Sequence, residues 1–206
     1  MQNKKDLQVM LKEAIVLFVI TLIAGLVLGF AYELTKEPIR LQKEKAIQEA
    51  CLTVFDNAAS FVECEMILDE EVSEQLANNG VHIGVVYEAM DSSGKLLGYV
   101  LESTSKQGYK GNIVLYMGVT LDGVLNGVSI IEIHEDAGLG ALAPKVLVPQ
   151  FAGKKVDSFI YTKTGAVQDN EIDAISGATV TTKAVTNAVN GGLKAVQTLI
   201  GGGSNE

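Results

Sequence analysis

The segment from Asp173 to Thr179 reads Asp-Ala-Ile-Ser-Gly-Ala-Thr and holds the side chains best suited to chemistry in this chain. Thr181 and Thr182 follow it, so several hydroxyls crowd a glycine-containing turn that opens an apolar, helix-like repeat. The first turn of a helix leaves backbone N–H groups unpaired at the positive end of the helix dipole. We therefore expect a phosphate group to bind here. A plain helix cap would explain one hydroxyl at this junction, but not the whole group.

A second glycine-rich segment, residues 138–143, formally matches G-x-G-x-x-A after a strand, the pattern of a dinucleotide-binding turn. Pro149 and Gly153 leave room for only a short helix behind it, and the flanking strands resemble hairpins. A dinucleotide-binding unit of that kind needs parallel strands joined through a helix. We therefore favour a different role for this loop.

The two histidines, His82 and His134, offer little metal chemistry. His82 lies in an apolar strand, where a packed imidazole is the commoner outcome. His134 stands beside Glu132, Glu135 and Asp136, a group that could hold a hard cation but is more often the polar end of a strand. No spacing of cysteines and histidines fits zinc or an iron–sulfur cluster, so we expect no metal site.

The elements that must position this chemistry begin with residues 14–32, a run without Asp, Glu, Lys or Arg. As a helix it would measure roughly 28 Å, close to the hydrocarbon thickness of a bilayer. A buried core helix and a cleaved signal peptide are the alternatives, but the run lacks a polar face and a small-residue cleavage site. We expect one transmembrane helix, in which Gly25 and Gly29 could let a partner helix approach.

The 206-residue chain is 48% hydrophobic and 20% charged, which excludes disordered, collagenous and disulfide-framework classes. Its net charge is −9, and because residues 1–32 carry three Lys and two acidic groups, residues 33–206 carry −10. A domain this acidic, without a basic stripe, is not expected to bind nucleic acid. Basic residues are nearly balanced on both sides of the apolar run and leave its orientation undecided. Cys51 and Cys64 could form a disulfide or remain two buried thiols.

Strand-like runs occupy residues 81–90, 95–103, 113–120 and 124–133, joined by short turn signals such as Asp122-Gly123. A further strand is expected at 156–162 and a helix at 179–200. The fold class is therefore α+β, a single N-terminal transmembrane helix followed by one domain with a mainly antiparallel sheet and flanking helices. The expected parts are a short cytoplasmic N-terminus (1–13), the transmembrane helix (14–32), a stalk helix and connector in which Pro38 marks a kink or restart (33–75), the domain (76–200) and a flexible tail (201–206).

The motif at 173–179 resembles the flavinylation motif of FMN-binding domains, in which a flavin transferase moves FMN from FAD onto the final threonine. Gly108-Tyr109-Lys110-Gly111, Asp122-Gly123 and Glu135-Asp136-Ala137-Gly138-Leu139-Gly140 are similar to further landmarks of this domain in the G subunit of Rnf complexes and the C subunit of sodium-pumping NADH:quinone reductases. The likeness covers nearly the whole chain, and the shortness of the chain favours the Rnf protein. The family loop usually reads Glu-Thr-Pro-Gly-Leu-Gly, so Asp136 and Ala137 depart from it.

The resemblance implies that the domain at 76–200 binds FMN and that Thr179 carries it covalently as a phosphoester. It also implies recognition and phosphate-turn roles for Asp173, Ser176, Gly177 and Ala178. Contacts on the side of the flavin ring would come from two loops, through Gly108, Tyr109, Glu135, Leu139 and Gly140. No catalytic acid, base or nucleophile is expected in this chain, because the flavin performs the redox chemistry.

The same resemblance implies an electron-transfer component of a membrane-bound complex that couples ferredoxin and NAD to sodium or proton transport. Its partners would be other Rnf-type membrane and iron–sulfur proteins, a flavin transferase and membrane lipid. The domain would lie on the extracytoplasmic side of the cell (inner or plasma) membrane. Two alternatives stay open: a membrane-anchored, flavin-carrying redox sensor outside an ion pump, and a non-flavin adhesion or binding domain in which Ser176 to Thr179 only cap a helix.

Overall fold

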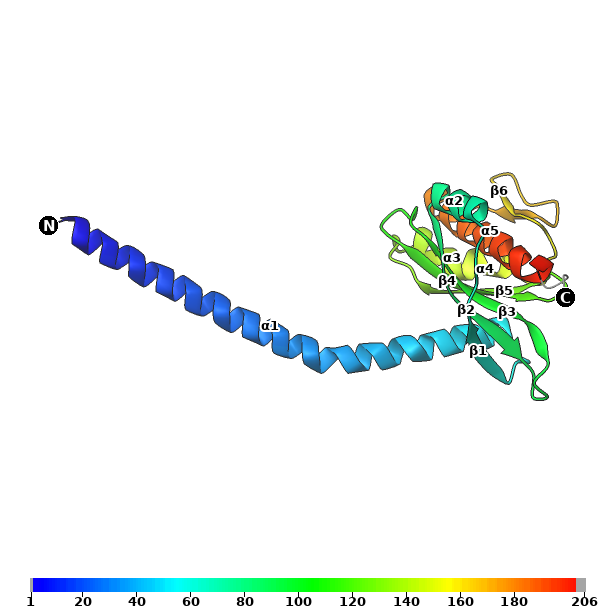
Figure 1. The fold of residues 1–206 in the computed structure, drawn as a ribbon. Helices are drawn as coiled ribbons and strands as arrows, with labels where there is room; N and C mark the ends of the chain where they lie inside the picture. Colours follow the sequence, from blue (N-terminus) through cyan, green and yellow to red (C-terminus); the bar gives the residue numbers. More distant parts are fainter. Residues whose placement is uncertain (1, 203–206) are drawn as a thin grey trace. The chain divides into compact units, whose positions relative to one another are not determined.

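The computed structural model describes residues 2–202, with side chains described for residues 7–201. It divides into two units, Met1–Lys45 and Ala46–Glu206. Helix α1 (Gln2–Val54) begins in the first unit and ends in the second (Figure 1). Pro38 lies inside α1, so the stalk continues the apolar helix and does not restart after the proline. Most of the expected tail, residues 203–206, lies outside the described residues.

The described part of the first unit is helix α1, whose apolar side chains are exposed on every side. Its most apolar window has a mean hydropathy of 2.8 with no residue buried, and the helix is long enough to cross a membrane. The hydroxyls of Thr21 and Thr35 donate to backbone carbonyls one turn earlier, each at 3.0 Å. Internal satisfaction of this kind is what a lipid environment requires of polar groups. These features agree with the expected transmembrane helix.

The second unit is built on a five-stranded antiparallel sheet in the order β1-β2-β3-β4-β5. Each strand pairs with the next in the chain, and the short turn signals predict this pairing for β2 with β3 and for β4 with β5. Gly123 adopts φ +78° in the turn between the last two strands, a conformation that glycine tolerates and other residues avoid. The strands are β1 (Ser60–Cys64), β2 (Val81–Met90), β3 (Leu96–Ser105), β4 (Ile113–Thr120) and β5 (Leu125–Glu132).

Helix α5 (Thr179–Gly202) packs on one face of this sheet (Figure 1). Its apolar stripe buries Ala188, Val189 and Leu193 against β-strand side chains that include Met117. Gly192 is needed for close approach, because an added Cβ would lie 2.1 Å from the Met117 sulfur. The predicted helix and its buried face are therefore confirmed.

The other face of the sheet is covered by the end of α1, residues 46–54, and by Phe55. Gly118 in β4 lets the Phe55 ring approach, since a Cβ there would lie 2.9 Å from it. Tyr116 is fully buried in this layer and donates its hydroxyl to Glu102 at 2.8 Å. Burial and this hydrogen bond both raise the pKa of Tyr116, so the phenol stays protonated. The domain thus has three layers, with the sheet in the middle.

The two cysteines lie on opposite faces of the sheet and are both free thiols. Cys51 is buried in the layer formed by the end of α1, whereas Cys64 packs against the layer that holds α5. The sheet separates their side chains, so of the two alternatives the structure has the free thiols. Burial raises the pKa of Cys51 to about 11.

Several elements were not expected from the sequence. Strand β1 falls within residues 33–75, where we expected stalk and connector, and helix α2 (Glu70–Asn78) begins there and runs into the expected domain. Of the strand expected at 156–162, only the last part forms, as β6 (Ile160–Thr162), and it pairs in parallel with a short new strand, β7 (Glu171–Asp173). Residues 138–143 lead into short helices with no parallel crossover, in agreement with the case against a dinucleotide-binding turn. The remaining elements are η1 (Gly140–Leu142), α3 (Ala143–Val146) and α4 (Val148–Phe151).

One expectation about β2 is wrong. His82 is exposed and is not a packed core imidazole, because the strand alternates and its buried neighbours Val81 and Ile83 point to the other face.

Candidate functional site

Three segments of the domain meet around a cleft of about 370 Å³. This volume falls within the range of roughly 300–1,000 Å³ that is usual for small-molecule sites. The segments are the loop after β3, the loop after β5 and the N-terminal turn of α5. The residues that line the cleft are Tyr109, Glu135, Asp136, Leu139, Gly140, Gly177, Ala178, Thr179, Val180 and Thr181.

Seven of the ten residues predicted to bind the cofactor line this cleft, although they come from three segments far apart in the sequence. They are Tyr109, Glu135, Leu139, Gly140, Gly177, Ala178 and Thr179. Gly108, Asp173 and Ser176 do not line it. The prediction missed three lining residues: Asp136, which follows Glu135 directly, Val180, for which the sequence holds no signal, and Thr181, whose position two residues after Thr179 could have suggested it.

The hydroxyl of Thr179 differs from its neighbours. Within the described residues it has no hydrogen-bond partner, and it lies half-buried in the cleft. Thr181 donates to Glu135 at 2.7 Å. Thr182 donates to the Ala178 carbonyl and accepts from the Ile175 N–H. Ser176 is exposed outside the cleft. Among the Ser and Thr side chains of this turn, Thr179 is therefore the one whose hydroxyl is both in the cleft and available to a ligand.

The backbone at this point offers further donors. The Thr182 N–H bonds to the Ala178 carbonyl, and the N–H groups of Thr179, Val180 and Thr181 precede that bond. The first N–H groups of a helix have no intrahelical acceptor and favour an anion. Gly177, with φ +76°, turns the chain into the helix. The arrangement suits a phosphate ester on a side chain of the first turn.

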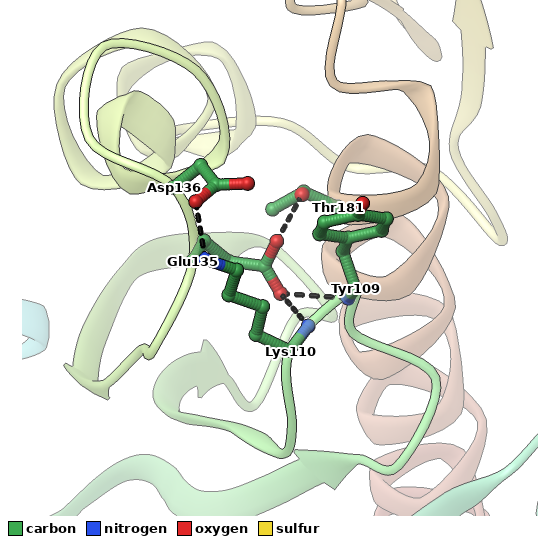
Figure 2. Close-up of polar contacts among 5 residues, drawn as sticks. All are labelled: Tyr109, Lys110, Glu135, Asp136 and Thr181. Atoms are coloured by element: carbon green, nitrogen blue, oxygen red, sulfur yellow. Dashed lines mark hydrogen bonds and ion pairs between the residues drawn. The ribbon is translucent and has the colours of Figure 1, made fainter.

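Glu135 joins the three segments (Figure 2). Its Oε1 accepts hydrogen bonds from the backbone N–H groups of Tyr109 at 2.7 Å and Lys110 at 3.3 Å. Its Oε2 accepts from the hydroxyl of Thr181 at 2.7 Å. Both carboxylate oxygens are thus engaged by the protein itself.

Lys110 and Asp136 form an ion pair across the same two loops, with 2.5 Å between Nζ and Oδ1 (Figure 2). The hydrogen bond to Asp136 and its negative charge raise the pKa of Lys110. Asp136 is one of the two positions where this sequence departs from the family loop, and its carboxylate is turned to this pair. Both side chains are roughly half exposed, so solvent screens the interaction.

Asp173 has a role outside the cleft. Its carboxylate accepts from the Ala166 N–H at 2.7 Å, and its own backbone N–H and carbonyl pair with the side-chain amide of Gln150. Nearby, the backbone N–H groups of Val167 and Gln168 bond to Glu171 and lower its pKa. The two carboxylates therefore hold the loop between β6 and β7 and fix the strand that leads into the motif.

The acidic residues around His134 do not converge on a cation. In the described part of the chain, no three His, Cys, Asp or Glu side chains are grouped as metal ligands would be. Glu132 lies 3.7 Å from His134, while Glu135 and Asp136 turn to the partners described above.

A second groove, of about 450 Å³, lies between α2 and α5. Several of its polar side chains already have partners in the protein: Lys194 bonds to Gln75, and Asn190 bonds to the backbone of Phe159 at both ends of its amide. The smaller cleft remains the candidate site, because it contains an available hydroxyl.

Known proteins similar to this chain include a family of FMN-binding domains and several G subunits of ion-translocating oxidoreductase complexes. A family model described as an FMN-binding domain matches residues 108–194. The G subunit of the Na⁺-translocating ferredoxin:NAD⁺ oxidoreductase complex of Acetobacterium woodii is 33% identical over 204 residues, which cover 94% of this chain and 95% of that protein. The G subunit of the ion-translocating oxidoreductase complex of Methanosarcina acetivorans is 30% identical over 180 residues, 87% of this chain and 90% of that protein. The proton-translocating counterpart of Clostridium ljungdahlii is 33% identical, with 87% and 88% covered.

Among solved structures, NqrC of Shewanella oneidensis is 26% identical, with 57% of this chain and 59% of that chain covered at a TM-score of 0.48. The C subunit of the Na⁺-translocating NADH-quinone reductase of Parabacteroides distasonis is 22% identical, with 68% and 78% covered at a TM-score of 0.47.

Proposed function

The chain belongs to the G-subunit family of Rnf ion-translocating oxidoreductase complexes, and on that premise we propose that it carries FMN as a phosphoester on Thr179 and relays electrons within such a complex. It is a subunit of an ion-translocating ferredoxin:NAD⁺ oxidoreductase with an FMN-binding domain and one long apolar helix. Family membership favours electron transfer in a pump over the redox-sensor and adhesion alternatives. Beyond family membership, we propose the covalent link to FMN, Thr179 as the attachment residue, and the relay of electrons.

The observation that carries the attachment site is the Thr179 hydroxyl, which lies in the cleft without a partner among the described residues. The residues around this hydroxyl fit the phosphate and the ring of FMN. Three backbone N–H groups without intrahelical acceptors are available to phosphate oxygens, and Leu139, Val180 and the Tyr109 ring offer apolar surface to a flavin ring. FMN, when bound, supplies one- and two-electron redox chemistry.

Attachment requires a transferase and FAD. The Thr179 oxygen forms a bond to the phosphorus of the FMN half, the pyrophosphate bond to the AMP half breaks, and AMP leaves with the bridging oxygen. The hydroxyl proton passes to a base of the transferase. The chain itself contributes the nucleophilic oxygen and the N–H donors that stabilise the remaining phosphate charge. It needs no acid or base of its own for this step.

The partners and placement in the membrane follow from family membership as part of the proposal. Residues 14–32 would cross the cell membrane among lipid and other membrane subunits, and the flavin would exchange electrons with neighbouring iron–sulfur subunits. The acidic domain would face away from the cytoplasm. Protease treatment of intact cells tests this: digestion of the domain from outside supports it, and digestion only after lysis contradicts it.

The test of function uses the full chain, co-expressed with a flavin transferase and purified in detergent. We expect ultraviolet fluorescence that stays with the denatured polypeptide on a gel, and loss of that fluorescence in Thr179→Ala. Thr186→Ala is the matched control, because Thr186 lies on the same helix and donates its hydroxyl to the Thr182 carbonyl away from the cleft. Fluorescence that persists in Thr179→Ala would contradict the attachment site, and a colourless wild type would contradict the flavin function.

A further inference from the structure

The Glu135 carboxylate is largely occupied by protein donors. Its two oxygens accept three hydrogen bonds, from Tyr109 and Lys110 in the loop after β3 and from Thr181 in α5. The charged acceptor makes these bonds stronger than bonds between neutral groups. Glu135 therefore presents little accepting capacity to a ligand, although the family resemblance suggested a flavin contact for it.

Two glycines leave room for this contact, because they carry no side chain. A Cβ at Gly108 would lie 2.8 Å from Oε1 of Glu135 and 2.2 Å from the Gly111 carbonyl oxygen. A Cβ at Gly140 would lie 2.5 Å from the Thr181 hydroxyl and 2.8 Å from Glu135. Side chains at either position would push the carboxylate or the hydroxyl out of place, so Gly108 leaves room for the contact although it does not line the cleft.

Thr181 lies two residues after Thr179 in the same first turn of α5. Its hydroxyl is held by Glu135, and that carboxylate also holds the loop that carries Tyr109 on the other side of the cleft. The contact thus fixes both the turn that presents Thr179 and the loop that faces it. Small misplacements of a reacting group cost large factors in rate.

We propose that Glu135 is a positioning residue for FMN attachment, acting through Thr181 to hold the Thr179 hydroxyl toward the cleft. This rests on the proposed function, since it concerns the same attachment step. The Glu135 contact also keeps the Thr181 hydroxyl occupied, so that the transferase meets one free threonine in the cleft. The role depends on where Glu135 places its hydrogen bonds, so a neutral side chain that keeps these bonds should retain most of it.

The test measures the initial rate of FMN attachment to the full chain in detergent, with purified transferase and FAD. We expect Glu135→Ala and Thr181→Val each to lower the rate about tenfold or more. The double variant should be no slower than Glu135→Ala, because both changes remove one contact. Glu135→Gln and Thr181→Ser should stay within about threefold of wild type, since the glutamine oxygen still accepts from the backbone and its amide can donate to Thr181. Thr186→Val is the control for a lost buried hydroxyl and should not slow attachment.

Wild-type rates in both Glu135→Ala and Thr181→Val, or multiplicative losses in the double variant, would overturn the proposal. A slow Glu135→Gln beside a fast Thr181→Val would also overturn it, because it would show that the charge acts directly. If Glu135→Ala does not fold, the attachment rates of Thr181→Val and Thr181→Ser are compared instead, and equal rates would overturn the proposal. A wild type that accepts no FMN would instead contradict the proposed function.

Discussion

Helix α1 leaves Leu17, Phe18 and Ile20 each more than half exposed, whereas helix α5 buries Ala188 and Val189 completely. Both helices are rich in apolar residues, but α1 carries them all around its axis and α5 carries them on one stripe. An apolar helix without a polar face needs an apolar solvent, and a striped helix needs only one partner surface. The exposed apolar part of α1 thus has the surface that a membrane-spanning helix needs, whereas α5 has the surface of a helix packed on a sheet.

The contrast continues within α1. Its last turns, residues 46–54, change from exposed to buried, with Cys51 and Val54 packed in the layer that covers one face of the sheet. Helix α5 carries the two features that the site needs, an unpaired N-terminal turn and a buried stripe that anchors it. A helix can present a reactive hydroxyl with constant geometry only if its other faces are fixed.

The largest expected effect comes from a charge in the apolar run. Leu22→Arg should shift the apparent free energy of membrane insertion by about 2.5–3.5 kcal/mol toward the uninserted state. A translocon insertion assay measures this shift. The matched change in α5, Gln197→Arg at an exposed position, should leave insertion unchanged. Equal effects of the two variants would break the distinction between the helices.

The buried end of α1 should protect its cysteine. Because the pKa of Cys51 is raised to about 11 from 9.0, its thiolate fraction at pH 8 is about 100-fold below that of an ordinary thiol. Maleimide labelling followed by mass spectrometry should modify Cys64 at least tenfold faster than Cys51 at pH 8. Labelling of Cys51 should accelerate as the pH rises toward 11.

The denatured chain is the control for this labelling, since both thiols should then react alike. Fast labelling of Cys51 in the folded protein would contradict the buried placement, and a Cys51–Cys64 disulfide would contradict the assignment of the two thiols to opposite faces.

A larger side chain in place of glycine should also have different effects on the two helices, and here the effect is on the stability of the domain. Gly192→Val should destabilise the domain by about 1–3 kcal/mol, because its Cβ would enter the space of Met117. Gly25→Val should not change the stability of the isolated chain, since nothing lies within 4 Å of that position. Thermal melts of the detergent-solubilised chain measure both, with roughly 2–4 °C expected per kcal/mol. A stable Gly192→Val would mean that α5 does not pack as described.

The smallest effect concerns the ion pair at the cleft. The raised pKa of Lys110 means that its contribution to stability is present at neutral pH and is lost only as alkaline pH rises through that pKa. Because the pair is exposed, Asp136→Asn should change the melting temperature at pH 7 by no more than about 1 °C. It should leave FMN attachment unchanged. A large loss of attachment would show that Asp136, and not Glu135, organises the cleft.

The sequence predicted the elements in which the apolar pattern repeats over many residues. Strands β2 to β5 and helix α5 each repeat apolar residues over eight or more positions. Strand β1 was missed because it has five residues, and helix α2 because its Asp-Glu-Glu start looks like a polar connector. The parallel pair β6 and β7 is three residues long on each side, too short for any period to show.

Seven of the ten residues predicted for the site line one cleft, but the hydrogen bonds that join its segments could not be predicted from the sequence. The motif at Thr179 is local, so the resemblance could place it. The hydrogen bond from Thr181 to Glu135 joins residues 46 positions apart, and the bonds from Tyr109 and Lys110 span 26 and 25. Contacts of this kind exist only in the folded chain, which is why the sequence could not show that Asp173 also holds the β6–β7 loop.

The central claim is that FMN is bonded to Thr179, and peptide mapping by mass spectrometry of the protein from its native membrane tests it most directly. We predict that the tryptic peptide containing Thr179 carries one FMN through a phosphoester, and that fragmentation places the added mass on Thr179. An unmodified peptide, or an added mass on Ser176, Thr181 or Thr182, would contradict the account.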